Sequence, residues 1–440
     1  MIIAKPSESQ LTGGALSVGA RGFDRPAARI SVIALAIIIL VRPKELNFLR
    51  LLPFIVPLLC GALFLASRSR VGLKSVRVPL SVLVMVSWFV TTTVWSGARA
   101  YSLAESCVIV GVSGIAALVA TSSTLRTLVG GTMIGCLAIL VMSVTVALLH
   151  PAYGLVSDEY EHGALQGVLL DRNSLGFVLV IGLMATLTFE FRGRWCFAER
   201  VALAAAFLGG VIWTKSATSL ILAVIAILLA ILLTLPRQLP PRHRWWGLGT
   251  VVIVTAGSIL YVGTHLDKLL KVVDRDSTFT GRTQIWPAVR EAIASHPWLG
   301  HGWGGVWGPT PIHQQINRAI GFEVPHAHNG YLDAQVQVGE IGLILLLVVV
   351  TIVAIRGVGF YMKSDSSLSS WPLIFLVIVL VDNRVETTLA VPSTLFLLVS
   401  TLVVLTGTQR SANQAPPDES RRPSPLPRPK RVPNVISISS

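Results

Sequence analysis

The chain has 440 residues, of which 52% are hydrophobic and only 13% are charged. Its apolar residues gather in runs of roughly 14 to 22 that short polar links separate, which is the pattern of an all-α polytopic membrane protein and not of a soluble domain. The net charge of +14 would suggest a nucleic-acid partner in a soluble protein. Here basic residues beside membrane spans and anionic inner-leaflet lipid explain the charge, so we expect membrane lipids and no nucleic acid as partners.

About twelve apolar runs are candidates for membrane-spanning helices, and several are short enough to need tilt or flanking residues to complete a crossing. The predicted organisation is a tail at 1–29, nine spans within 30–263, a long link at 264–333, three spans within 334–406 and a Pro-rich basic tail at 407–440. The candidate runs are residues 30–41, 51–66, 78–95, 103–120, 127–149, 174–189, 199–213, 217–235, 246–263, 334–355, 371–381 and 390–406.

The distribution of lysine and arginine predicts the orientation of these spans. Short links that are cytoplasmic when the N-terminus is inside hold most of the basic residues, as the positive-inside rule requires. We therefore expect both termini in the cytoplasm and the long link 264–333 on the outer face. Residues 1–29 lack an apolar core with a cleavage site, so they read as a tail and not as a signal peptide.

Nucleotide-dependent chemistry leaves no clear motif in the chain. Neither a GxxxxGK[ST] loop nor a GxGxxG turn occurs, which disfavours ATP-driven transport. The triplet Asp274 to Asp276 resembles the acidic pair with which many glycosyltransferases hold a metal and a nucleotide sugar. It lies on the expected outer face, where nucleotide sugars are not expected, so we predict no metal and no cofactor.

Two outer links place a cation beside the end of a span. In EHGALQGVLLDRNSLG, Asn173 or Ser174 is expected to cap the next helix. Arg172 then lies at a helix N-terminus, which favours anions, although an arginine that contacts lipid headgroups would occupy the same place. In the tight turn WTKSATS, Lys215 fits a ligand contact or a lysine that snorkels to the interface.

The long link contains a predicted amphipathic helix. Ile285, Trp286, Val289 and Ile293 fall on one helical face, which we expect to rest on the outer surface of the membrane. Arg282 precedes the first turn, where a cation opposes the helix dipole unless an anion lies nearby. Arg282 is therefore a candidate binding residue.

A polar stripe opens the tenth span in PHAHNGYLDAQVQVGEIG. On a helix that begins near Asn329, the residues Asn329, Asp333, Gln337 and Glu340 share one face, which must contact protein or a wet cavity. Asn329 and Asp333 are therefore candidate supporting residues.

The same stretch holds two glycines and two histidines. Gly339 and Gly342 provide a small-residue face for close helix packing. His328 lies at the mouth of the helix, where the positive end of the dipole favours its neutral, proton-accepting form, and a purely structural capping role is the alternative. His326 and His328 suggest a metal pair, but no third ligand stands at a convincing spacing.

An outer site without nucleotides or metal needs a substrate that is already activated. Sugar linked to a polyprenyl diphosphate meets this need, because the diphosphate leaves without a general acid once cations neutralise its charge. A neutral histidine supplies the base, or the orienting acceptor, for the attacking hydroxyl.

Three motifs resemble one family of bacterial membrane glycosyltransferases, the O-antigen ligases and O-antigen polymerases. The first is His328-Asn329 followed after nine residues by Gly339-x-x-Gly342. The others, RDSTFTGRTQIW with HPWLGHGWGGVW, and GVLLDRNSLG, resemble the exopolysaccharide polymerase branch. The resemblance implies a GT-C-like fold with a large extracytoplasmic loop containing short amphipathic helices, and metal-independent, inverting transfer of a lipid-linked glycan.

The resemblance also implies roles for individual residues. Arg282 would bind the diphosphate, His328 would activate or orient the acceptor, and Arg172 would be a second cation before Asn173. Lys215 stands where the family often has an arginine, which keeps the charge but loses the planar fork. Asp171 replaces the histidine that the family pattern leads us to expect before the basic residue.

The resulting hypothesis is a polymerase in the bacterial cytoplasmic membrane, with an extracytoplasmic site that joins polyprenyl-diphosphate-linked oligosaccharide repeats. A ligase that moves finished glycan to lipid A core or protein shares the chemistry and remains open. A flippase for the lipid-linked repeat and a non-catalytic scaffold among other polysaccharide assembly proteins also remain open; both would tolerate loss of Arg282 and His328.

Overall fold

The computed structural model describes residues 26–40, 78–157, 162–169, 171–253, 257 and 282–414. This part of the chain is helical and contains no strand beyond an isolated bridge between Leu155 and Leu165. An eight-residue or longer helix occurs at α2 Pro26–Leu40, α4 Leu80–Thr91, α5 Arg99–Thr121, α6 Leu125–Leu149, α8 Arg172–Thr188, α9 Cys196–Trp213, α10 Ala217–Leu232, residues 244–253, α13 Arg282–Ser295, α14 Pro311–Ile320, α15 Gly330–Lys363, α16 Trp371–Asp382 and α17 Pro392–Gln414. Short turns are α7 Pro151–Gly154, α11 Leu235–Gln238, η4 Thr92–Val94, η5 Pro241–His243 and η7 Ser367–Ser370.

The all-α membrane class predicted from composition is confirmed in outline. Five described helices are long and apolar enough to cross a membrane by length and composition: α5, α6, α9, the segment 217–238 and α15. Five other apolar helices are shorter, among them α8, α16 and α17. The predicted run 51–66 and most of the two tails lie outside the described residues, so the count of twelve crossings stays a prediction.

Close helix packing in the bundle depends on small residues. α2 lies along α6, where a Cβ added to Gly131 would stand 2.6 Å from the Cβ of Ile33. α8 packs on α6, α9 and α10, and most of its residues from Leu175 onward are buried. α8 is therefore a central helix, and the candidate residues at its start are held by neighbours on several sides.

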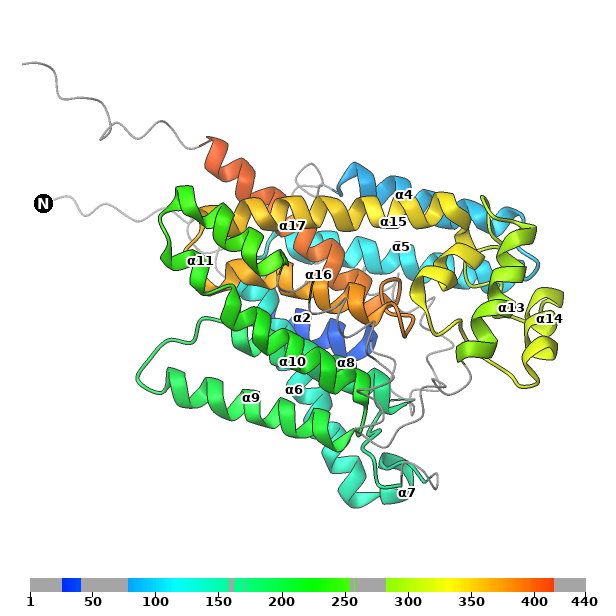
Figure 1. The fold of residues 1–440 in the computed structure, drawn as a ribbon, viewed down its shortest axis with the longest axis horizontal. Coiled ribbons are helices and arrows are strands. Elements are labelled where there is room, and N and C mark those ends of the chain that lie inside the picture. The colour runs from blue at the N-terminus through cyan, green and yellow to red at the C-terminus, as the bar shows by residue number, and fades with distance from the viewer. Residues whose placement is uncertain are drawn as a thin grey trace, which may run out of the picture.

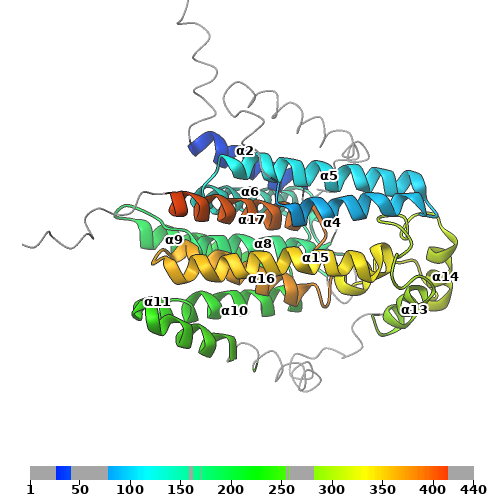
Figure 2. The same cartoon turned by 90° about the horizontal axis from the view of Figure 1, so that it is seen from above.

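The two ends of the bundle differ. Figures 1 and 2 both show α13 and α14 beyond one end of α15, while α11 lies at the opposite end of the molecule. The starts of α5, α8 and α15 and the end of α16 lie toward the α13 and α14 end (Figure 1). The described segments among those that the sequence assigned to outer links are thus gathered at one end.

α13 and α14 have a small core of their own. Ile285, Val289 and Ile293 of α13 are buried with Ile316 of α14 and Val336 of α15, while Arg290 and Glu291 are exposed. The amphipathic helix is confirmed, but the face that we expected to rest on the membrane packs on protein instead. Helix α13 is therefore anchored to the start of α15, which fixes Arg282 relative to the loop that carries His328.

α15 is broken at Gly339. This residue has φ 70° and ψ −178°, a region open essentially to glycine alone, and a Cβ there would lie 2.1 Å from the carbonyl oxygen of Trp298. The backbone N–H of Glu340 donates to the Pro297 carbonyl at 2.8 Å instead of continuing the helix. Gly342 faces α4, where its Cβ would stand 3.1 Å from Trp88. The predicted small-residue face thus lets the loop at Trp298 and the side chain of Trp88 pack closely on α15.

Replacing Gly339 by alanine is expected to lower the thermal unfolding midpoint. Alanine rarely adopts these backbone angles, and its Cβ would have no room beside the Trp298 carbonyl. The loss should reach about 3 kcal/mol or more. The matched control is Gly114→Ala in α5, where a Cβ meets nothing within 4 Å and stability should be unchanged or slightly higher. Thermal unfolding of both purified variants in detergent would measure the difference, and equal midpoints would contradict it.

Candidate active site

Glu386 lies at the centre of a cluster that three distant segments build. Its Oε1 accepts from Nη2 of Arg282 at 2.6 Å, and its Oε2 lies 3.1 Å from Nδ1 of His328. Arg282 opens α13, His328 lies in the loop before α15, and Glu386 lies in the link between α16 and α17. The structure thus brings together the two residues that the sequence singled out as catalytic, through a carboxylate that it did not.

The electrostatics of this cluster follow from burial. Only 10% of the Arg282 side chain and 16% of the Glu386 side chain are exposed. Burial alone would raise the pKa of the Glu386 carboxyl, but the hydrogen bond from His328 and the charge of Arg282 outweigh it and hold that pKa below its usual value. Glu386 is therefore ionised near neutral pH, so the Nδ1–H of His328 donates to it and Nε2 is left as the proton acceptor.

His328 has a backbone conformation that residues other than glycine rarely adopt. Its φ is 48°, in the left-handed region, which costs a non-glycine residue about 1–2 kcal/mol. Its backbone N–H donates to Nδ1 of His326 at 3.2 Å, and the two rings lie 4.0 Å apart. The hydroxyl of Thr387 is the second polar neighbour of that Nδ1, at 3.4 Å. The loop therefore fixes the direction of the His328 ring.

His326 supports this loop as a neutral ring. Burial, and then the neighbouring charge of a protonated His328, lower its pKa to about 4. A neutral imidazole can accept the His328 backbone N–H, whereas an imidazolium could not. His326 is thus assigned to the architecture of the site.

The polar stripe at the start of α15 is satisfied by protein. Asn329 is the N-cap, and its Oδ1 accepts from the N–H groups of Tyr331 and Leu332, which confirms the predicted start of the helix. Asp333 accepts from the Ala327 N–H at 3.0 Å and from the Gln337 amide at 2.5 Å. Asp333 therefore ties the loop that carries His328 to its own helix.

Asn173 joins α8 to the same cluster. Its Nδ2 donates to Oε1 of Glu386 at 3.2 Å, and its Oδ1 accepts from the Ser216 hydroxyl at 2.8 Å. The expectation that Asn173 or Ser174 caps α8 is wrong: Asp171 is the N-cap and accepts from the Ser174 N–H at 2.8 Å. The freed Asn173 side chain is thereby available to hold Glu386.

Arg172 and Lys215 lie next to residues of this cluster in the chain, beside Asn173 and Ser216. Nη1 of Arg172 donates to the Lys215 carbonyl at 2.6 Å, and Nζ of Lys215 donates to the His162 carbonyl at 2.8 Å. Lys215 also has a left-handed backbone, with φ 52°. The two cations are neighbours, and Asn173 connects their end of α8 to Glu386.

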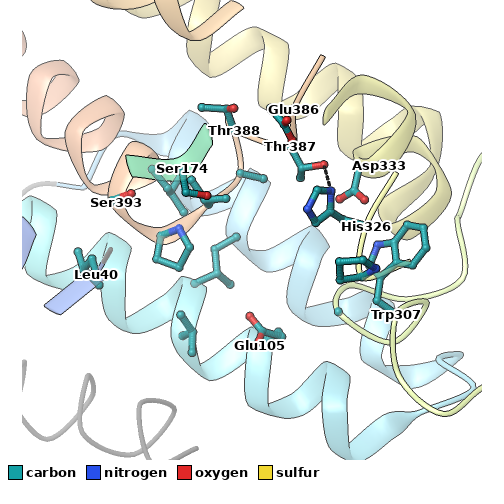
Figure 3. A pocket seen from close by; sticks show the side chains of 18 of the residues that line it. Leu40, Glu105, Ser174, Trp307, His326, Asp333, Glu386, Thr387, Thr388 and Ser393 are labelled. Carbon is teal, nitrogen blue, oxygen red and sulfur yellow. Dashed lines mark hydrogen bonds between the residues drawn. The ribbon is translucent and has the colours of Figure 1, made fainter. Parts of the chain in front are cut away.

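A cavity of about 750 Å³ lies beside the cluster. One part of its wall is polar, with His326, His328, Asp333 and Glu386, and Figure 3 shows His326, Asp333 and Trp307 together on one side. Leu40 stands on the other side of the view together with Ser174 and Ser393. Apolar residues of α5, α8 and α17 line a further part of the wall. The apolar lining residues are Leu40, Val108, Ile109, Val112, Phe177, Val178, Ala390, Val391 and Leu395. The cavity is amphipathic, within the size range of ligand pockets, about 300–1,000 Å³.

His326, His328 and Glu386 could hold a divalent ion by geometry. Each offers one ligand atom, and the three atoms lie within 4.8 Å of one another. Glu386 supplies the third ligand that the sequence spacing did not reveal. Its Oε1 already pairs with Arg282, and a cation bound there would lie beside a buried guanidinium that repels it. These contacts favour the arginine and histidine chemistry over a metal centre.

The chemistry of this cluster is therefore expected to survive chelation. We expect 5 mM EDTA to leave the rate within about twofold of the untreated protein, because the charge beside Glu386 is supplied by Arg282. The measurement is the initial rate of product formation with EDTA, and again after adding back Mg²⁺, Mn²⁺ or Zn²⁺. A rate that collapses with EDTA and returns with one ion would assign His326, His328 and Glu386 as its ligands.

Glu386 is the principal residue that sequence reasoning missed. It stands in the short link NRVETT, which the predicted orientation places on the same outer face as Arg172 and the long link. That shared face was a usable signal, but it did not separate Glu386 from Asp382, the other carboxylate of the same link. The spacing to its partners, 104 residues to Arg282, carries no sequence signal.

The described part of the chain is helical, and in it an arginine, a carboxylate and a histidine meet beside an amphipathic cavity. Residues 201–347 match the family described as O-antigen ligase. The matched region includes Lys215, Arg282 and His328 and excludes Arg172 and Glu386.

A second comparison gives a relative over a longer stretch. The chain is 28% identical over 279 residues to the exopolysaccharide production protein ExoQ of Rhizobium meliloti (strain 1021). The alignment covers 59% of this chain and 60% of that protein. The resemblance inferred from the sequence motifs, to the O-antigen ligase and polymerase family and its exopolysaccharide branch, is confirmed.

Proposed function

We propose that the protein is a polysaccharide polymerase that transfers polyprenyl-diphosphate-linked oligosaccharide repeats onto a growing lipid-linked glycan. The observation that supports this proposal most directly is the amphipathic cavity. Its polar wall holds His328 and Glu386, and its apolar wall suits a prenyl chain. The match of residues 201–347 to the O-antigen ligase family supports a transferase of this type. The exopolysaccharide production role in the name of the Rhizobium relative favours polymerisation over ligation.

The chemistry assigned to the cluster is an inverting substitution without metal. The acceptor hydroxyl attacks the anomeric carbon, its proton passes to Nε2 of His328, and the bond from that carbon to the diphosphate oxygen breaks. The imidazolium formed is stabilised by Glu386, 3.1 Å from Nδ1. Arg282 carries five N–H donors and neutralises the leaving diphosphate, with Arg172 and Lys215 supplying further positive charge at the end of α8.

The proposed topology follows the predicted orientation. Both termini are cytoplasmic, about twelve helices cross the membrane, and the end of the bundle that carries α13 and α14 faces outward. The gathering of Arg172, Arg282 and His328 near one end supports this arrangement, because an extracytoplasmic substrate must reach all three.

A reconstitution assay tests the proposal. The full chain is purified in detergent and mixed with a polyprenyl-diphosphate-linked repeat, without nucleotide sugar or divalent metal, and the products are separated on a gel. A ladder of increasing length from the wild type, absent with His328→Ala, is the expected result. Arg318→Ala, an exposed change in α14, is the control and should leave the ladder intact.

The alternatives give different outcomes in the same assay. A ligase would form a single larger product only when a lipid A core or protein acceptor is added. A flippase would form no new glycosidic bond and would move the lipid-linked repeat across vesicles equally well with His328→Ala. Either result would overturn the polymerase proposal.

A further inference from the structure

We infer that the loop 297–299 is a lipid-binding surface, which inserts Trp298 and Leu299 into the boundary between headgroups and acyl chains. The loop follows α13 and bonds to α15 at the break formed by Gly339. Its partner is the bilayer leaflet at the α13 and α14 end of the bundle (Figure 1). The inference depends on the membrane class of the fold and not on the reaction proposed above.

Two large apolar side chains protrude from this loop. Trp298 is 63% exposed and Leu299 is 43% exposed. The backbone that carries them is fixed on α15. The Pro297 carbonyl accepts from the Glu340 N–H at 2.8 Å. The Trp298 carbonyl faces the Ile341 N–H at 3.4 Å. The loop therefore presents both side chains from a fixed support, which lowers the entropic cost of binding.

The length of α15 places this loop at one boundary of the membrane. Between Glu340 and Lys363, which ends the helix, residues 341–362 contain a single charged side chain, Arg356. An apolar helix of about 20 residues crosses the hydrocarbon core, which is about 30 Å thick. With Lys363 in one headgroup layer, Glu340 reaches the other. The loop bonded to Glu340 is therefore level with that second layer.

The lipid-facing side of α15 begins at the same level. Ile344, Val348 and Ile355 are 48%, 42% and 66% exposed, and their spacing puts them on one helical face. In a helix of membrane-spanning length and composition, an exposed apolar face contacts acyl chains. The loop is bonded to α15 one turn before Ile344, so Trp298 and Leu299 adjoin the level at which this lipid-facing surface begins.

Two further tryptophans lie beside the loop and the break. Nε1 of Trp88 donates to the Val338 carbonyl at 2.9 Å, and Nε1 of Trp95 donates to the Gly300 carbonyl at 3.2 Å. Tryptophan is enriched at membrane–water interfaces, because the indole combines an apolar ring with a polar N–H. Trp88, Trp95 and Trp298 at one level of the bundle match the aromatic belt of a headgroup boundary.

The residues before the loop limit how deeply it enters the leaflet. Ser295 and His296 are exposed and lie within hydrogen-bond distance of each other, at 3.1 Å, and Arg290 and Glu291 are exposed earlier in α13. Polar groups of this kind are costly to place among acyl chains. Only the loop 297–299 therefore enters the boundary. It makes the membrane contact that the sequence assigned to the apolar face of α13, which protein covers.

Photo-crosslinking in vesicles tests this surface. p-Benzoylphenylalanine replaces Trp298 in the full chain, which is reconstituted in vesicles of phosphatidylethanolamine and phosphatidylglycerol, irradiated and analysed by mass spectrometry. We expect a lipid adduct at position 298, with a yield at least about fivefold above that of the same group placed at the exposed Arg290. The same group at Ile355, on the lipid-facing side of α15, is the positive control. A crosslink from 298 to a second copy of the chain, or a lipid yield no higher than at Arg290, would overturn the inference.

Quenching by brominated lipids measures the depth without a crosslinker. The wild type and Trp298→Phe are compared in vesicles whose lipids carry bromine either near the headgroup end of the acyl chain or near its terminal methyl. The fluorescence lost in the variant belongs to Trp298. We expect bromine near the headgroup to quench it at least about twofold more than bromine near the methyl. Trp371→Phe, which changes a fully buried residue, is the control, and its lost fluorescence should be quenched weakly at both depths. Equal quenching of the Trp298 fluorescence at both depths, or none, would contradict a place at the boundary.

Discussion

Replacing Arg282 by alanine is expected to slow glycan transfer by about 10²–10³-fold, the loss typical of removing one preorganised donor from a developing negative charge. The buried carboxylate of Glu386 would also lose its partner at 2.6 Å. Breaking a buried pair on one side costs about 3–5 kcal/mol, so this variant should also unfold at a lower temperature. Initial rates and thermal unfolding, measured on the same preparation, give both effects.

Arg282→Lys separates charge from geometry in this prediction. Lysine keeps the positive charge beside Glu386 but loses the planar fork that binds two oxygens of a phosphate. We expect most of the stability to return while the rate stays at least tenfold low. Arg290→Ala, an exposed arginine two turns along α13, is the control and should change neither quantity. A full rate in Arg282→Lys would show that the positive charge beside Glu386 is sufficient without the planar fork.

The local parts of this site were predictable from the sequence. Periodicity on one helical face predicted α13, and a polar residue before a run of helix-forming residues predicted the start of α15 at Asn329. Both signals depend on neighbours within a few positions. Such signals remain valid in any tertiary context, which explains why these elements match the structure.

The sequence failed where the answer depended on distant packing. The apolar face of α13 has the pattern of a helix on a membrane surface, and only the positions of α14 and α15 show that protein covers it. In the same way, both Asp171 and Asn173 are good caps, and the contact of Asn173 with Glu386 decides which of them caps α8. Cap preference alone does not distinguish two good caps that stand two residues apart.

Strain and polar support meet at the same loop. His328 has a left-handed backbone, and Gly339, eleven residues later, has angles that only glycine adopts readily. Asp333 lies between them and holds both the Ala327 N–H and the Gln337 amide. A conformation of this kind persists only where the surrounding contacts determine it, so the buried network around Asp333 is what keeps the His328 ring directed at Glu386.

Glu386→Gln is expected to slow transfer by about 10²-fold or more while it preserves the size of the side chain. A carboxylate that orients a histidine and stabilises its imidazolium contributes more to the rate than an amide does. The amide can also turn its own N–H toward the Nδ1–H of His328, and two donors do not bond to each other. Loss of this charge should also change the shape of the pH–rate profile, because the imidazolium formed during transfer is no longer stabilised by Glu386. An effect on folding alone would reduce the rate equally at every pH.

The pH dependence has a defined sign. The pKa of Glu386 lies below its usual value of 4.5, so its stabilising contacts are fully present above that pH and are lost as the pH falls through the lowered pKa. Any acid limb above pH 5 in the wild type must therefore come from a group other than Glu386. Glu291→Gln, exposed on α13, is the control for the change of charge. An unshifted profile in Glu386→Gln would leave Glu386 as a partner of Arg282 alone, and the histidine would then act without a carboxylate behind it.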